Sequence, residues 1–108
     1  MTTVFIVYNA KDADAKAADE YEKYLKEKKV ALVRSQPYIK SYEIYRIDKV
    51  LGAEDKPPYQ FVAKLEISDM GEFAKAMQSP EMQAFVKEYR TYLESSPNIW
   101  TIGHKIEP

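Results

Sequence analysis

The amino-acid sequence predicts an α+β fold in which the unit strand–helix–strand occurs twice within one domain, residues 1–108. Short apolar runs predict four strands, and apolar residues at helical spacing predict two helices. The elements follow in the order β-α-β-β-α-β. This order is typical of the ferredoxin-like pattern, a four-stranded antiparallel sheet with two helices on one face. A chain of 108 residues is long enough for one modest core.

The first half of the chain supplies one strand–helix–strand unit. Residues 2–9 form the first strand, whose continuous apolar run predicts that both of its faces are covered. A helix follows over residues 12–29, and its lysine-rich end suits the negative carboxyl end of a helix. Residues 30–40 are expected to form an irregular connector with a bend at Pro37. Residues 41–51 form the second strand, with polar residues on both faces as at a sheet edge.

The second half repeats the unit. Residues 61–67 alternate between apolar and polar side chains, as a strand with one buried face requires. Asp69 then caps a short helix, and residues 79–81, Ser-Pro-Glu, start a longer one with a hydroxyl cap, a proline and a carboxylate. Residues 95–98 are expected to end this helix. Residues 99–106 form the last strand.

One face of the predicted sheet has no helix to cover it, although the strand positions that point there include apolar residues. Exposed apolar surface of that extent marks an interface. We therefore expect an isologous homodimer through the open sheet face, in which two sheets pack together and close a shared barrel.

Composition excludes several classes of function. Sixteen basic and seventeen acidic residues give a net charge of -1, so we expect no nucleic-acid partner. The chain has no cysteine, one histidine and three scattered glycines, which argues against a thiolate site, a transition-metal site and a phosphate-binding loop. No cofactor is predicted. The amino-terminal apolar run is too short for a signal peptide or a membrane span, so a cytoplasmic location is expected.

A few side chains are candidates for chemistry. His104 shares a strand face with an aromatic side chain and is a candidate general base, although it can equally be a solvated residue near the chain end. Arg46 is a candidate partner for a carboxylate or an oxyanion, or else it pairs with a neighbouring acid. Aromatic side chains with a polar tip can line a cavity or form its rim, and they also occur as plain core residues. The candidates for substrate binding are Tyr8, Tyr42, Tyr59 and Trp100, with Tyr45 as a further possible hydroxyl.

Four segments of the chain resemble a known superfamily. They are AADEYEKYLKEKKVALV, KSYEIYRIDKVLG, PPYQFVAKLEISDMGEFAKAMQSP and FAKAMQSPEMQAFVKEYRTYL. In their order and spacing they are similar to the dimeric α+β-barrel superfamily, especially its EthD-like and REDY-like members. The resemblance implies a homodimer of ferredoxin-like subunits, each with a small-molecule pocket between sheet and helices. EthD-like members are linked to degradation and dehydratase-type chemistry, REDY-like members to prodigiosin-type and bisindole-type gene sets with cyclisations, and other branches to cofactor-free monooxygenases.

The sequence departs from the EthD-like pattern at one position. Those members carry a histidine after the first helix, in a context such as His-x-Pro-Leu, whereas this chain has Lys28-Lys29-Val30-Ala31-Leu32. By this resemblance Lys29 stands where the catalytic histidine would be. A lysine takes over acid–base work only if burial lowers its pKa considerably.

These observations favour a small-molecule enzyme of secondary or degradative metabolism. It would carry out cofactor-free proton transfer, cyclisation or dehydration on a hydrophobic or aromatic substrate. A non-catalytic binding or carrier dimer needs only the cavity, and a structural interaction domain needs a filled interior instead.

Overall fold

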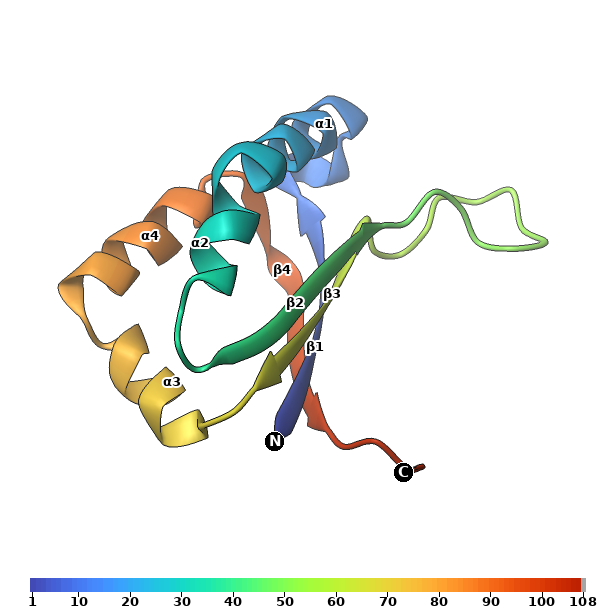
Figure 1. Ribbon diagram of the computed structural model, residues 1–108. Coiled ribbons are helices and arrows are strands. Elements are labelled where there is room, and N and C mark those ends of the chain that lie inside the picture. Colours follow the sequence, from blue (N-terminus) through green and yellow to red (C-terminus); the bar gives the residue numbers. More distant parts are fainter. Residues whose placement is uncertain (108) are drawn as a thin grey trace.

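The computed structural model describes residues 1–107 and shows a four-stranded antiparallel sheet with its helices packed on one face (Figure 1). The strands are β1 (Thr2–Ala10), β2 (Ile39–Arg46), β3 (Phe61–Ile67) and β4 (Leu93–Gly103), in the spatial order β2-β3-β1-β4. The helices are α1 (Ala15–Tyr24), α2 (Val30–Arg34), α3 (Met70–Met77) and α4 (Pro80–Arg90). A 3-10 turn, Lys11–Ala13, precedes α1, and a π-helical turn, Leu25–Lys29, joins α1 to α2. This architecture confirms the predicted ferredoxin-like fold.

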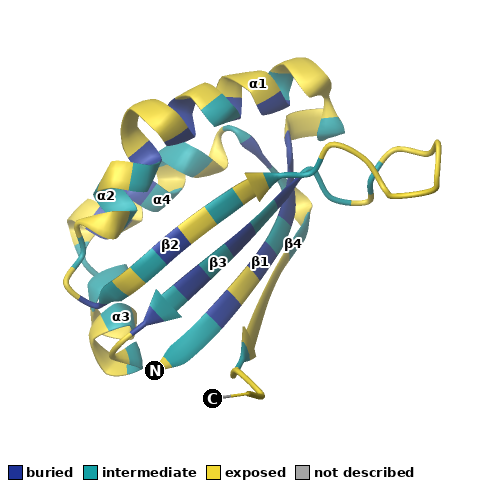
Figure 2. Cartoon of the chain, turned by 45° about the vertical axis from the view of Figure 1, so that its right-hand side comes forward, coloured by how far each residue is buried: buried dark blue, intermediate teal, exposed yellow. Residues whose placement is uncertain are grey.

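The register of the sheet turns alternate residues toward the helices. Ile6 and Tyr8 of β1 pair with Ala63 and Phe61 of β3, and all four side chains are buried. Figure 2 shows this alternation of buried and less buried residues along β1 and β3. Phe5, between them, is 43% exposed on the opposite face. In the single chain the helices cover one face of the first strand, so the cover predicted for its other face would have to come from a second subunit.

The first helix is longer than predicted. Residues 30–40 are not an irregular connector throughout, because Val30–Arg34 continues the helix after the π-helical turn. The prediction is wrong because Leu32 and Val33 pack against the core, so burial extends the helix until the chain nears Pro37. Lys29 therefore lies inside a helical segment and not at a helix end.

Helix starts follow side-chain caps. Asp14, Asp69 and Ser79 each accept a hydrogen bond from the backbone N–H three residues later, at 3.2, 3.0 and 3.2 Å. The caps at Asp69 and Ser79 are confirmed predictions. The first helix begins only after Asp14, because Asp12 has a φ of 58°, a left-handed backbone conformation that a right-handed α-helix does not contain.

The last strand starts earlier than predicted. Residues 95–98 do not end a helix but lie within Leu93–Gly103, and α4 already ends at Arg90. Leu93 follows Tyr89 at helical spacing, yet it is buried and pairs with Ala10 of β1. Pairing across the sheet thus decides the boundary that local spacing leaves open.

The second strand is shifted relative to the predicted residues 41–51. It begins at Ile39, which pairs with Ile67, and ends at Arg46, which pairs with Phe61. Phe61 is the first residue of β3, so residues beyond Arg46 have no strand to pair with. They form a loop that projects away from the body of the molecule (Figure 1). Over the described part of the chain, no helix combines the length and the apolar character that a membrane span requires.

Candidate functional site

A pocket lies between the helix-bearing face of the sheet and the helices. All four strands, the π-helical turn and helices α2, α3 and α4 contribute to its wall. Its enclosed part is small, with a cavity volume of about 80 Å³, and the space around it opens to solvent. Most of the wall is apolar, as in pockets that hold small organic molecules. Representative lining residues are Ile6, Leu65, Phe73, Met82 and Phe85.

The pocket opens between α3, α4 and β4. A shallow groove on the surface shares Phe73, Tyr89, Arg90 and Trp100 with the pocket lining, so these residues mark the mouth. Register places Trp100 opposite Ile6 and therefore on the helix face of the sheet, where it remains 48% exposed. Arg90 at the same mouth is exposed. A flat ligand can therefore enter beside an aromatic ring and a guanidinium group.

Lys29 is the buried cation of this pocket. Its side chain is 8% exposed, and its Nζ donates a hydrogen bond of 2.7 Å to the Tyr21 hydroxyl. The same Nζ lies 3.9 Å from the centre of the Tyr89 ring and 5.8 Å from that of Tyr8. Within residues 1–107 no carboxylate forms an ion pair with it, whereas the neighbouring Lys28 pairs with Glu88 at 2.7 Å. Lys29 is thus held by aromatic groups alone.

The π-helical turn explains how a residue in the charged run Lys26–Lys29 reaches the interior. Tyr21 and Lys29 are eight residues apart, which on a regular α-helix separates them by a rotation of about 80°. The wider turn over Leu25–Lys29 reduces this rotation and brings both side chains to the face that packs on the sheet. Single π-helical turns of this kind are frequent at functional sites.

Burial controls the electrostatics of the pocket. Desolvation lowers the pKa of Lys29 to about 7, so near neutral pH roughly half of the side chains carry no charge. Desolvation also raises the pKa of the Tyr8, Tyr21 and Tyr42 hydroxyls, which keeps them protonated. A neutral amine beside protonated phenols can accept a proton and pass one on.

A chain of hydroxyl groups leads from Lys29 toward the sheet. The Tyr21 hydroxyl, which accepts the hydrogen bond from Lys29, is also 2.8 Å from the Tyr8 hydroxyl. Tyr8 and Tyr42 both line the pocket, as does Lys29. Packing of Phe61 against the rings of Tyr8 and Tyr21, at 5.6 and 5.0 Å between centroids, fixes this geometry.

Tyr38 presents a second polar group to the pocket. Its side chain is 5% exposed and packs edge to face on Phe73, with 5.7 Å between ring centroids. Its hydroxyl has no hydrogen-bond partner within residues 1–107. A buried hydroxyl without a partner is costly, which distinguishes Tyr38 from the other residues of the pocket wall.

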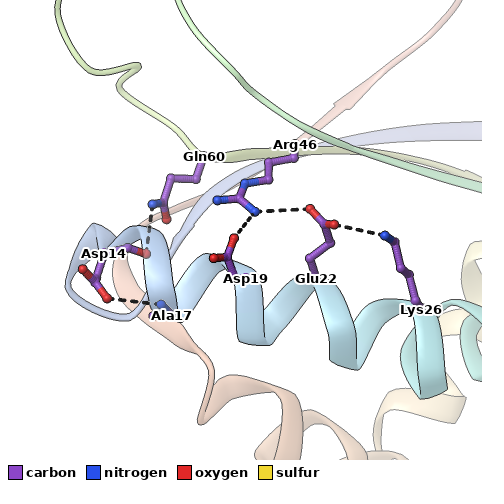
Figure 3. A network of polar contacts seen from close by, with 7 residues as sticks. All are labelled: Asp14, Ala17, Asp19, Glu22, Lys26, Arg46 and Gln60. Carbon is purple, nitrogen blue, oxygen red and sulfur yellow. Dashed lines mark hydrogen bonds and ion pairs between the residues drawn. The ribbon is translucent and has the colours of Figure 1, made fainter.

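The structure places the other predicted site residues outside the pocket lining. Arg46 reaches from the end of β2 to α1, where its Nη1 is 2.6 Å from Asp19 Oδ1 and 3.3 Å from Glu22 Oε1 (Figure 3). His104 is exposed beyond the end of β4, and Tyr59 is half-buried just before β3. Catalytic roles for Arg46 and His104 stay predictions that the pocket geometry does not support.

Sequence reasoning overlooked Tyr21, Tyr38 and Tyr89. Tyr21 and Tyr89 lie on the apolar faces of their helices, where the sequence pattern predicts a core residue. Only their distances in space to Lys29 and to the strand tyrosines indicate a role in the site, and these distances are known only once the fold is known. Across residues 1–107, no group of three or more His, Cys, Asp or Glu side chains is placed to hold a metal ion.

These features define a ferredoxin-like α+β protein with an apolar pocket between sheet and helices and a buried amine in its wall. The chain belongs to the family described as REDY-like protein HapK, whose match spans residues 2–104. A comparison with curated proteins gave no significant match.

Solved structures share this fold over nearly the whole chain. HapK from Hahella chejuensis is 18% identical and has a TM-score of 0.74. The match covers 100% of this chain and 95% of HapK. An EthD family protein from Bacillus halodurans is 16% identical, with a TM-score of 0.71 and coverage of 98% and 99%. At such identities the likeness establishes the fold.

Two further structures bear on chemistry and assembly. SnoaB from Streptomyces nogalater, described as a cofactor-independent oxygenase, has a TM-score of 0.67 at 15% identity, covering 99% of this chain and 94% of that one. A protein from Thermobifida fusca described as dimeric and ferredoxin-like has a TM-score of 0.64 at 14% identity, covering 96% and 90%. The fold is therefore shared with a protein described as an oxygenase and with one described as a dimer.

Proposed function

We propose that this protein binds a hydrophobic or aromatic small molecule in its pocket and transfers a proton to or from it without a cofactor, as a step of secondary or degradative metabolism. The observation that carries this proposal is Lys29, a buried lysine of the pocket lining that has no carboxylate partner within residues 1–107. Such a group serves as the base of a proton transfer, and cyclisation or dehydration are reactions that this transfer would assist.

The free-energy cost of burying Lys29 favours a functional role for this side chain. A buried lysine without an ion-pair partner destabilises the fold, because the charged form loses its hydration. A methionine of similar length would fill the same space without that cost. Strongly perturbed titratable groups in a cleft are typical of catalytic sites.

A non-catalytic binder is the second candidate. The Tyr89 ring lies 3.9 Å from Lys29 Nζ and partly shields it, while the rest of the pocket is mostly apolar. A binding or carrier protein would use the cavity and the Tyr38 hydroxyl but not the basicity of Lys29. Proton exchange on a bound probe separates the two candidates.

The probe for the enzyme reading is 2-tetralone, an aromatic ketone with exchangeable hydrogens beside its carbonyl. In D2O we expect the protein to accelerate their exchange, with a rate that rises as Lys29 loses its proton and is half-maximal near pH 7. Lys29→Met is expected to slow this exchange roughly 100-fold or more, followed by NMR. Lys28→Met is the matched control. Binding of 2-tetralone without accelerated exchange would favour the carrier reading, whereas acceleration that Lys29→Met leaves unchanged would refute Lys29 as the base.

Tyr38→Phe tests the polar anchor of the pocket. We expect 2-naphthol to bind about tenfold more weakly, since one hydrogen bond is worth about 1 kcal/mol. The free energy of unfolding is expected to stay level or rise, because the lost hydroxyl has no partner to leave behind. Calorimetry and urea unfolding measure the two effects. Tyr59→Phe is the control outside the lining, and a Tyr38→Phe protein that binds normally would contradict the assignment.

We also propose that the chain forms a homodimer through its open sheet face. Pairing aligns Tyr45, Val62, Val7 and Ile99 in one row across all four strands. Tyr45 and Ile99 are 57% and 43% exposed in the single chain. A row of this kind supports an isologous contact, and the dimeric description of a structure with the same fold agrees with it.

A further inference from the structure

The pocket holds a primary amine and almost no other titratable chemistry. Among residues 1–107, Lys29 and Arg90 are the only charged residues of its lining, and Arg90 lies at the mouth. In the described part of the chain no carboxylate and no histidine lines it, so the acid and base groups found there are the amine and tyrosine hydroxyls. An amine differs from a carboxylate or an imidazole in one respect that matters here. It forms a stable double bond to carbon.

We propose that Lys29 forms a covalent imine with an aldehyde or ketone carbonyl of an aromatic or hydrophobic molecule in the pocket. This inference rests on the proposed function, because it requires that the pocket admits such a molecule. It deepens that function by naming the substrate class as carbonyl compounds and by giving Lys29 the role of nucleophile.

The reaction balances with the amine and the carbonyl compound alone. The lone pair of neutral Nζ forms a bond to the carbonyl carbon while the carbon–oxygen π bond opens, and a proton moves from nitrogen to oxygen to give a carbinolamine. The carbon–oxygen single bond then breaks, and the oxygen leaves as water with the second hydrogen of the amine. Protonation of the imine nitrogen gives the iminium ion, and water reverses each step.

The contacts of Lys29 suit each of these steps. The Tyr21 hydroxyl, 2.7 Å from Nζ, and the Tyr8 hydroxyl, 2.8 Å further along, can deliver and receive the protons. The face of the Tyr89 ring, 3.9 Å from Nζ, attracts a cation and therefore favours the iminium ion. Because most of the wall is apolar, the water that is released has few partners in the pocket.

An iminium ion would also explain why so small a site can move protons. It withdraws electrons from the neighbouring carbon and so makes the hydrogens there more acidic. Proton loss from that carbon gives an enamine, which can attack an electrophile within the same molecule and close a ring. Lys29 would thereby serve first as nucleophile and then as an electron-withdrawing group, with the tyrosine hydroxyls carrying the protons.

The test uses 2-naphthaldehyde, which has no hydrogen on the carbon beside its carbonyl and so reports imine formation apart from proton exchange. The purified protein is incubated with this aldehyde and sodium cyanoborohydride at pH 7, and the labelled lysine is located by peptide mass spectrometry. At this pH an ordinary surface lysine is neutral about once in a thousand molecules. Among the lysine side chains we expect the label on Lys29, at least about tenfold above any other lysine, and label on the α-amino group of Met1 is counted separately. Lys28→Met retains the label and Lys29→Met loses it.

A parallel binding experiment separates this inference from the proposed function. 2-Naphthalenemethanol has the same ring system but no carbonyl, and saturation-transfer NMR reports whether it occupies the pocket. If the alcohol binds while Lys29 stays unlabelled, or labels spread evenly over surface lysines, the imine is refuted and proton transfer by Lys29 stands. If neither compound binds, both the imine and the proposed function fail for aromatic ligands.

Discussion

Replacing Lys29 with methionine is expected to raise the free energy of unfolding by about 2–4 kcal/mol at pH 7 while it slows proton transfer roughly 100-fold or more. Burial lowers the pKa of Lys29 from 10.5 to about 7, which corresponds to on the order of 4 kcal/mol of lost stability in its charged form. Attraction of the charged amine to the tyrosine rings offsets part of this loss of stability, up to about 2 kcal/mol. Methionine fills the space without the charge and with no base to offer.

The same lysine predicts how stability depends on pH. Between about pH 7 and pH 10 the unfolded chain keeps its proton on Lys29 while the folded chain has lost it, so the wild-type protein gains stability as pH rises. Below pH 7 Lys29 is protonated in both the folded and the unfolded chain, so the free-energy cost of burying its charge no longer changes with pH. Nζ lies near the Tyr21 hydroxyl and the rings of Tyr8 and Tyr89. The hydroxyls of these three tyrosines have raised pKa values in the fold, so ionisation of the unfolded chain opposes this gain only near pH 10 and above.

Urea unfolding of both proteins from pH 6 to 9, at one protein concentration, measures this effect. The difference in stability between Lys29→Met and the wild type should shrink as pH rises. Lys28→Met is the control, because that side chain is exposed and pairs with Glu88 at the surface. A Lys29→Met protein that is less stable than the wild type at pH 7 would show that Lys29 is a structural residue.

Replacing Val62 with lysine is expected to convert the proposed dimer to a monomer. Val62 lies in the row of apolar side chains on the open face, between Tyr45 of β2 and Val7 of β1. In an isologous contact the substitution places two charges in the same apolar interface, one from each subunit, and neither has a partner there.

Light scattering after size-exclusion chromatography measures this prediction. The wild type should have twice the mass of one 12.5 kDa chain, and Val62→Lys should have the mass of one chain. Ala84→Lys on the exposed face of α4 introduces the same charge away from the sheet and should remain dimeric. A monomeric wild type at about 100 µM, well above a micromolar dissociation constant, would refute assembly through this face.

Local signals in the sequence predict much of the fold, and long-range packing decides the rest. The caps at Asp69 and Ser79 lie within three residues of the groups they satisfy, so the sequence alone identifies both helix starts. Leu93 satisfies both helical spacing from Tyr89 and strand pairing with Ala10. Only the second contact, between residues distant in sequence, determines that it lies in a strand.

Local sequence signals also predicted part of the candidate site, and long-range packing determines the rest. Alternation along the strands places Tyr8, Tyr42 and Trp100 on the helix side, and all three line the pocket. Lys29 belongs to a run of charged residues that reads as solvent-facing, and no local pattern indicates the π-helical turn that turns it inward. Resemblance to a family singled out this position, and the structure supplies the burial that its proposed chemistry requires.

The pKa of Lys29 tests the central claim most directly. NMR of the side-chain Cε–H groups, with Lys29→Met to assign the signal, follows each lysine as pH changes. We predict that Lys29 titrates near pH 7, apart from the surface lysines. Titration of Lys29 above pH 10, as for an unperturbed lysine, would show that the amine is charged at neutral pH, and both its role as base and its role as nucleophile would be contradicted.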